Sequence, residues 1–444
     1  MKILVAFKRV AEKIPYPVGR VVAHIPYSLR LGRTYSKYSK FLPLFESFDP
    51  FEKNNFVIKK LNNIVQYAQR NIPFYKELYG KGIIQIEKMS DFEELPIITR
   101  GEVRNYTQRA NGAMLLNTGG TSGEPLSFYV DNQAWAREWA HMHYIWARKG
   151  YKVGDLMLTM LGKNLFGHFY RYNAVHNEFR LNPYMDAGEN INHVRLLFER
   201  YPISFFQGYP SSIYNFFREI EPFVDDHLKD LIRQKIRCCL FSSEYPLPYM
   251  TRYISADWML DYISWYGHSE MCILAYEDIA EGGYVPLQTY GLAEVCNGIL
   301  CGTSYNNFDM PLIRYSTGDL VEGFVDETGL LRSFKVTQGR SGDYVQDKNG
   351  RHLSLTALIF GRHHLIFNHA DFVQVYQRVP GELSIFVTLK RGINIVQTDM
   401  SQMFDTRDAN FQFSFRTLKE PILTKSGKLK LLVSDSDINA IGVA

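Results

Sequence analysis

The sequence predicts an α/β protein with a large N-terminal domain and a small α+β C-terminal domain, on three observations. The chain has 444 residues, more than a single hydrophobic core usually supports. Between residues 125 and 243, short β-rich segments alternate with helical patterns, which indicates largely parallel sheets. After residue 280 the pattern changes to short strands separated by Gly-rich turns. We therefore expect a basic arm over 1–50, a large domain of α/β and β-rich parts over 51–340, and a small domain over 341–444.

Helical periodicity dominates the first part of the large domain. Apolar residues recur every three or four positions from Ile58 to Ala68, which predicts a helix over 51–79. Pro73 and Gly80 mark its end.

Further elements follow in order along the chain. Thr99 and Glu102 have the spacing of a capping box, which predicts the start of another helix. Strands are predicted at 125–130, 156–161, 204–209 and 236–243, and a helix at 132–149. The tetrapeptide Asp-Glu-Thr-Gly at 326–329 predicts a hairpin turn. Beyond it we expect helix to return only near 354–361.

Composition suits a soluble globular protein: 46% of residues are hydrophobic and 22% are charged. A net charge of +4 does not suggest a nucleic-acid partner. The five cysteines are odd in number and form no C-x-x-C pair, which favours a reducing compartment. No apolar run is long enough for a spanning helix or a secretory signal, so we expect a cytoplasmic protein.

The N-terminal arm is unusually basic. Residues 1–40 contain nine Lys and Arg against the single acid Glu12, a net charge of +8. Two interpretations remain open at this point. The arm either packs on the large domain, or it contacts an acidic partner or an anionic membrane surface, which would make the protein peripheral at the inner membrane.

The segment Asn117–Pro125 is the most informative part of the sequence. Its core, Thr-Gly-Gly-Thr-Ser-Gly, places three glycines and three hydroxyls in six residues. Glycine lets backbone N–H groups close around an anion, and the hydroxyls can donate to phosphate oxygens. The alternative is an ordinary polar turn. A nucleotide P-loop of the Walker type is excluded because no Gly-Lys-Ser/Thr follows.

This segment, TGGTSGEP, resembles the phosphate loop of the adenylate-forming superfamily of acyl- and aryl-CoA ligases. The resemblance is closer to the phenylacetate–CoA ligase branch, and within it to the CapK-like proteins associated with capsular polysaccharide biosynthesis. Six further motifs carry it: LPIITRGEVR at 95–104, GYPSS at 208–212, WYGHSE at 265–270, PLIRYSTGDL at 311–320, GRSGDYV at 339–345 and LTKSGKLK at 423–430. One departure is Glu124, which stands where many members carry Lys. We expect Glu124 to point away from the phosphates.

The resemblance implies a role for each matching residue. It assigns ATP binding to Thr118, Gly119, Gly120, Thr121, Ser122, Gly123, Ser243, Glu244, Tyr266, Gly267, Ser269, Asp319 and Arg340. It makes Lys428 and Glu270 catalytic, with Glu270 also holding Mg²⁺, and it places a hinge at Asp343 about which a mobile C-terminal domain turns. Tyr209, Ser211 and His268 would contact the substrate, with aromatic residues of 135–146 as weaker candidates. No Arg or Lys stands out as a residue that would bind a charged group of the substrate.

A second Tyr-Gly-x-x-Glu sequence ends at Glu294, in a stretch that reads as a strand. The family has a similar strand there, so we assign Glu294 no metal role.

The function that the resemblance implies is ATP-dependent activation of a carboxylic acid to an acyl-adenylate with release of pyrophosphate. ATP and Mg²⁺ are the expected cofactors. The acyl acceptor stays open between CoA and an amine or hydroxyl, for example on an amino acid or a sugar nucleotide. The alternative from another class is a catalytically inactive binding or scaffold protein on the same fold, recruited to the membrane surface.

Overall fold

The structure is a computed structural model. It describes residues 14–105, 114–118, 126–162, 165–246, 248–338, 344–355, 358–359, 364–390, 393, 395–407, 409–422 and 431–439.

Helices open the described part of the chain. They are α2 (Tyr16–Ala23), α3 (Tyr27–Glu46), α4 (Pro50–Asn71), α5 (Pro73–Tyr79), α6 (Met89–Glu93) and α7 (Arg100–Asn105). The helix predicted over 51–79 is divided into α4 and α5 at Pro73, which lacks the N–H that would continue α4. The capping box before α7 is confirmed, because the Thr99 N–H donates to Glu102 Oε2 at 2.7 Å.

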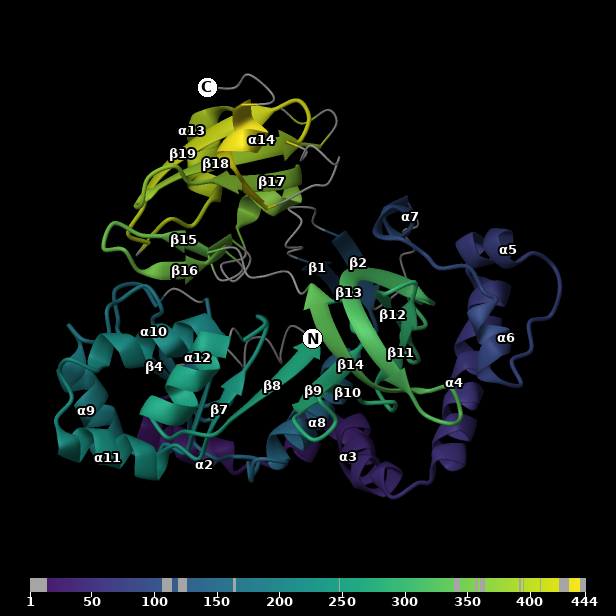
Figure 1. Ribbon diagram of the computed structural model, residues 1–444, viewed down its shortest axis with the longest axis horizontal. Coiled ribbons are helices and arrows are strands. Elements are labelled where there is room, and N and C mark those ends of the chain that lie inside the picture. The colour runs from purple at the N-terminus through teal and green to yellow at the C-terminus, as the bar shows by residue number, and fades with distance from the viewer. Residues whose placement is uncertain are drawn as a thin grey trace.

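A single mixed sheet of twelve strands forms the centre of the molecule (Figure 1). Its order is β11-β12-β13-β14-β10-β9-β8-β7-β6-β3-β5-β4. Strands β3 (Met157–Met160), β5 (Glu178–Leu181), β6 (Phe205–Gly208), β7 (Cys238–Phe241) and β8 (Tyr262–Gly267) run parallel to their neighbours in this set. From β8 to β9 the pairing becomes antiparallel. The strands predicted at 156–161, 204–209 and 236–243 are thus confirmed.

The antiparallel part of the sheet comes from the Gly-rich second half of the large domain. It contains β9 (Leu274–Asp278), β10 (Gly283–Pro286), β11 (Gly291–Cys296), β12 (Ile299–Ser304), β13 (Tyr315–Val325) and β14 (Leu331–Gln338). The predicted turn at 326–329 joins β13 to β14, with Gly329 at φ +85°. The expectation of largely parallel pairing holds for β3, β5, β6, β7 and β8, which belong to a larger mixed sheet. The α/β and β-rich parts share one continuous sheet, because β8 pairs with strands of both kinds.

Helices and a small hairpin cover the large sheet. The helices are α8 (Ala134–Ala147), α9 (Ile191–Arg200), α10 (Pro210–Ile220), α11 (Asp226–Lys235) and α12 (Pro248–Arg252). Strand β4 (Tyr170–Asn173) ends the sheet, antiparallel to β5. The hairpin pairs β1 (Met114–Thr118) with β2 (Leu126–Val130), so that Thr118 lies opposite Leu126 at the two ends of the Gly-rich segment. The segment itself lies outside the described residues.

The C-terminal part has a hydrophobic core, which Tyr184 of the large domain also joins, and a four-stranded sheet in the order β19-β18-β17-β20. Its elements are β15 (Tyr344–Gln346), β16 (His352–Ser354), β17 (Ala370–Tyr376), β18 (Glu382–Leu389), α13 (Gln397–Met403), β19 (Gln412–Leu418), β20 (Leu432–Val433) and α14 (Asp435–Asn439). The expectation that helix returns only near 354–361 is wrong, because α13 and α14 lie further along. Their short polar turns, such as Asp435–Asn439, show no helical periodicity to detect.

Polar contacts join this part to helix α10 of the large domain. Arg351 pairs with Glu219 of α10, its Nε donating to Oε1 at 2.7 Å. Asn215, also on α10, donates to the backbone carbonyl of His352 at 2.7 Å. Figure 1 accordingly shows β15 and β16 directly above α10. Within the described residues, no helix is long and apolar enough to cross a membrane.

Candidate active site

Three neighbouring strands of the large sheet carry most of the described candidate residues at their carboxyl ends. Strands β6, β7 and β8 are parallel, so the segments that leave them emerge at one edge of the sheet. Ser211 follows β6, Glu244 follows β7 and Glu270 follows β8. The sheet therefore gathers residues that lie up to 59 positions apart in the sequence.

Glu270 lies in the turn between β8 and β9 and is 94% buried. Tyr315, the first residue of β13, donates its hydroxyl hydrogen to Oε1 at 3.1 Å. On the other side, His268 Nδ1 lies 3.2 Å from Oε2. Because an ionised carboxylate only accepts hydrogen bonds, Nδ1 must carry the proton of this contact.

The environment of Glu270 favours its ionised form. Burial alone would raise the pKa of Glu270, but the hydrogen bond from His268 and the charges of His268 and Arg100 outweigh it and hold the pKa at about 2. Burying a charge costs several kcal/mol unless partners compensate for it. A buried carboxylate kept ionised at the edge of a sheet is therefore a candidate for holding a cation.

The charge on Glu270 makes part of the protein's stability depend on pH. Its pKa is about 2 in the fold against an ordinary 4.5, so the ionised form stabilises the fold above pH 4.5, and this stabilisation is lost as the pH falls toward 2. We expect the difference in free energy of unfolding between wild type and Glu270→Gln to shrink by about 2 kcal/mol from about pH 6 to pH 3. Denaturant unfolding of both proteins across this range measures the change. A difference that does not vary with pH would contradict the burial of an ionised carboxylate here.

Asp319 lies on β13, four residues after Tyr315. Tyr266, near the end of β8, donates its hydroxyl hydrogen to Asp319 Oδ2 at 2.7 Å. The two predicted nucleotide-binding residues are thus in direct contact, although 53 positions separate them. Since Tyr266 is two residues before His268, the Asp319 and Glu270 carboxylates lie beside the same short segment.

A second cluster surrounds Glu244 and includes a residue of the C-terminal part. The Ser211 hydroxyl donates to Glu244 Oε2 at 2.7 Å, and the Tyr344 hydroxyl lies 3.5 Å from the same oxygen. Ser243, immediately before Glu244, has a φ of +64°, a left-handed conformation that is uncommon for a residue with a Cβ and frequent at functional sites. Tyr209 is buried at the N-cap of α10, and burial raises its pKa.

Comparison with known proteins identifies the fold. No family model matches the chain. Protein CapK of Staphylococcus aureus is 23% identical to it over 369 residues, 75% of this chain and 78% of CapK. The crystal structure of 2-hydroxyisobutyryl-CoA ligase in the postadenylation state, in complex with R3-HIB-AMP, is similar over 90% of this chain and 93% of the ligase, at 17% identity and a TM-score of 0.51. The chain has the fold of the adenylate-forming superfamily.

A second structure of that ligase agrees with the first. In complex with 2-HIB-AMP and CoA, in the thioesterification state, it gives the same TM-score of 0.51 at 16% identity, again over 90% of this chain. The resemblance read from the motifs is therefore confirmed at the level of the fold, with CapK as a distant relative.

Several predicted site residues of the adenylate-forming fold lie outside the described residues. They are Gly119, Gly120, Thr121, Ser122, Gly123, Arg340, Asp343 and Lys428. Thr118 is described only as the last residue of β1. Six of the described members form three contacting pairs: Glu270 with His268, Asp319 with Tyr266, and Glu244 with Ser211.

Sequence reasoning missed two residues that act on Glu270. Tyr315 lies inside the PLIRYSTGDL motif, but only Asp319 was singled out there. Arg100 opens α7 within LPIITRGEVR and contributes its positive charge to the environment of Glu270. Both residues lie within family motifs, and this was the signal that could have found them. No rule of sequence spacing, however, connects Arg100 or Tyr315 to Glu270.

Glu294 lies on β11 and is buried beside Arg314, with Nη2 and Oε1 3.3 Å apart. Arg314 is the residue before β13, and β11 and β13 both pair with β12. The position of Glu294 agrees with the expectation of a strand, and its lack of a metal role remains a prediction.

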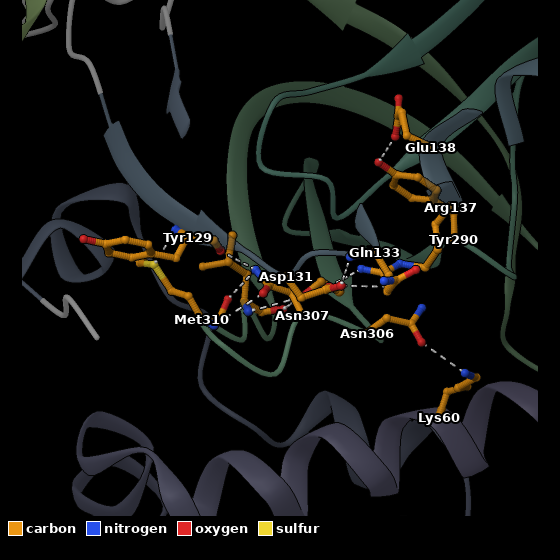
Figure 2. A network of polar contacts seen from close by, with 12 residues as sticks. Lys60, Tyr129, Asp131, Gln133, Arg137, Glu138, Tyr290, Asn306, Asn307 and Met310 are labelled. Atoms are coloured by element: carbon orange, nitrogen blue, oxygen red, sulfur yellow. Dashed lines mark hydrogen bonds and ion pairs between the residues drawn. The ribbon is translucent and has the colours of Figure 1, made fainter. Parts of the chain in front are cut away.

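Figure 2 shows a network of polar contacts around the N-terminal part of α8. Arg137 donates to Asp131 Oδ1 at 3.2 Å, and the Tyr290 hydroxyl donates to Glu138 at 2.5 Å. Arg137, Tyr290 and Met271, the neighbour of Glu270, line a cavity of about 20 Å³, room for one water molecule. Because Asp131 pairs with the Arg137 guanidinium, we do not expect this arginine to bind a charged group of the substrate.

Proposed function

We propose that the protein activates a carboxylic acid with ATP, forming an acyl-adenylate and releasing pyrophosphate. The observation that carries the proposal is the buried, ionised Glu270 at the edge of the sheet where Asp319, Tyr266 and Glu244 also lie. The adenylate-forming fold supports it. The narrower suggestion of a role in surface polysaccharide biosynthesis rests on the resemblance to CapK-like proteins, with which the distant match to Protein CapK agrees.

In this reaction a carboxylate oxygen of the acid attacks the α-phosphorus of ATP, and the bond to pyrophosphate breaks. Every reacting group is negatively charged, so the site must supply cations and directed donors more than a strong base. We assign the phosphates to the Gly119–Gly123 loop, the ribose hydroxyls to Asp319 with Arg340 beside it, and the adenine to Tyr266 and the Ser243–Glu244 turn. Lys428 would place its ammonium between the α-phosphate and the carboxylate during this step.

Mg²⁺ fits the chemistry of Glu270. Proteins hold this ion with one or two carboxylates while substrate phosphates supply further oxygens, and Glu270 offers one ionised carboxylate fixed by Tyr315. Among the described residues, no group of three or more His, Cys, Asp or Glu side chains is placed to hold a metal ion. When bound, Mg²⁺ would neutralise charge that develops on the phosphates.

We further propose that the segment 341–444 is the small mobile domain of this fold and turns about Asp343. Among the described residues its contacts across the boundary include polar pairs such as Tyr344 with Glu244 and Arg351 with Glu219, beside the packing of Tyr184 in its core. Interfaces with many polar contacts separate more readily than wholly apolar ones. The turn would withdraw Lys428 and admit the acceptor, either CoA or an amine or hydroxyl on an amino acid or sugar nucleotide.

Tyr209, Ser211 and His268 are our candidates for contacting the acid. His268 lies against Glu270, so an acid bound beside it would lie close to the proposed Mg²⁺ ligand. The Ser211 hydroxyl is already engaged by Glu244, which suggests that Ser211 shapes the pocket more than it binds the acid.

The test is a pyrophosphate-release screen over aromatic, aliphatic, amino and sugar acids, with and without CoA. We expect release that depends on at least one acid, and dependence on CoA distinguishes a thioester-forming ligase from one that uses another acceptor. ATP binding without release for any acid would favour the alternative, an inactive binding or scaffold protein.

Asp319→Asn should weaken ATP binding with little effect on chemistry. The substitution keeps the shape but removes the charge that would accept from the ribose hydroxyls, and hydrogen bonds to charged groups contribute about 1.5–3 kcal/mol. We expect KM for ATP to rise about 10- to 100-fold and kcat to change little. Glu322→Ala, an exposed acid on the same strand, is the matched control. An unchanged KM for ATP would remove Asp319 from the nucleotide site.

A further inference from the structure

The N-terminal helices present a basic stripe to solvent. On α3 the buried residues Tyr35, Tyr38, Leu42 and Phe45 recur at three- and four-residue spacing and face the protein. The opposite face carries the exposed residues Arg33, Lys37, Lys40 and Leu44 at the same spacing. This outer face is therefore a continuous row of three cations that ends in an apolar residue.

Helix α2 and the start of α3 expose large apolar side chains. Val18 is 60% exposed, Val21 is 68% exposed and Leu29 is 77% exposed, with Ile25 between them. The inner side of α2 is fixed by Gly19 and Ala23, which are buried, and by Tyr16, which stacks on Phe179. The outward valines consequently have no packing role in the described structure.

The charge on these helices is positive up to Phe45, and their acid, Glu46, is the last residue of α3 and pairs with Arg148. Residues 14–45 contain no Asp or Glu, and the exposed charged residues there are Arg20, Arg33, Lys37 and Lys40. Both helices lie along the lower edge of the molecule in Figure 1, the edge opposite the C-terminal sheet. A partner could cover them without approaching the C-terminal sheet.

We propose that this N-terminal face, made of Val18, Arg20, Val21, Ile25, Leu29, Arg33, Lys37, Lys40 and Leu44, docks on an anionic lipid surface. Exposed apolar residues interspersed with cations are the pattern of helices that lie in a membrane interface, the apolar groups entering the boundary region and the cations meeting the headgroups. A protein partner would require a complementary shape as well as complementary charge. A row of cations and valines without acids offers few contacts that would fix the orientation of such a partner. The proposal is independent of the proposed chemistry.

The cations and the apolar residues of the face contribute to binding in different ways. Each Lys or Arg near an anionic leaflet strengthens binding about fivefold, so removing three weakens it about 100-fold. This component falls as salt screens the charges, over a length of about 10 Å at 0.1 M. The apolar component does not depend on lipid charge, and insertion of the valines adds to binding in proportion to the area buried.

The experiment is flotation of the full chain with vesicles of phosphatidylcholine alone or with added phosphatidylglycerol, at low and high salt. We expect binding to the anionic vesicles only, weakened by salt. The triple variant Arg33→Gln, Lys37→Gln, Lys40→Gln should bind about 100-fold more weakly. Lys76→Gln, Lys81→Gln, Lys88→Gln is the matched control, because it removes the same charge from exposed positions elsewhere. The control should float as the wild type does.

Three results would overturn the proposal. The first is a wild type that does not float with anionic vesicles, and the second is a control triple that loses as much binding as the face variant. The third is a wild-type dimer in solution that Val21→Ser with Leu29→Ser dissociates, which would show that a second copy covers the face. Thermal melting of each variant establishes that it is folded.

Discussion

Replacing Glu270 with glutamine is expected to lower acid-dependent pyrophosphate release at least about 100-fold. Glutamine keeps the size of the side chain and can still accept from Tyr315, but it removes the negative charge that would hold Mg²⁺. The surroundings of Glu270 hold its pKa at about 2, so the charge is present at neutral pH. The measurement is release under saturating ATP and the best acid of the screen, at several Mg²⁺ concentrations.

Glu294→Gln is the matched control for this substitution. Glu294 ends the other Tyr-Gly-x-x-Glu sequence, but it lies on β11 beside Arg314. We expect any effect of Glu294→Gln to be on stability. The folded protein should release pyrophosphate at the wild-type rate. Equal loss of rate in Glu270→Gln and Glu294→Gln, with both proteins folded, would contradict the metal role of Glu270.

Lys428→Ala is expected to have the largest effect, a loss of about 10³-fold in pyrophosphate release. A single cation directed at the reacting phosphate contributes this much in phosphoryl-transfer enzymes because it meets the charge that develops in the transition state. Since the role is confined to that step, KM for ATP should change far less than kcat. Steady-state kinetics of the variant with the best acid provides the measurement.

The neighbours of Lys428 offer controls within one motif. Lys425 and Lys430 carry the same charge two or three positions away. Their alanine variants should keep release within a few-fold of the wild type. If all three variants were impaired alike, the segment would act through its general positive charge, and the specific assignment to Lys428 would fail.

Local patterns predicted the elements of the fold well because their causes are local. The helical spacing from Ile58 to Ala68, the Thr99–Glu102 capping box and the glycine of the 326–329 turn each depend on residues a few positions apart. The continuous mixed sheet could not be predicted in the same way. It depends on β8 accepting a parallel neighbour on one side and an antiparallel neighbour on the other.

The candidate site, like the fold, could be predicted from the sequence only in part. The family motifs identified Glu270, Asp319 and Glu244 from residue identity and order alone. They did not predict that Tyr315 donates to Glu270 or that Ser211 donates to Glu244, since these contacts join residues 45 and 33 positions apart. Such pairs are set by how strands β6, β7, β8 and β13 align in the sheet. No periodicity within a single element encodes them.

Acid-dependent exchange of labelled pyrophosphate into ATP tests the central claim most directly, because it reports reversible acyl-adenylate formation and needs no acceptor. We predict exchange with at least one acid of the screen, none without acid, and a loss in both Glu270→Gln and Lys428→Ala. A folded protein that binds ATP but exchanges no pyrophosphate with any acid would contradict the claim. So would exchange that persists undiminished in Lys428→Ala.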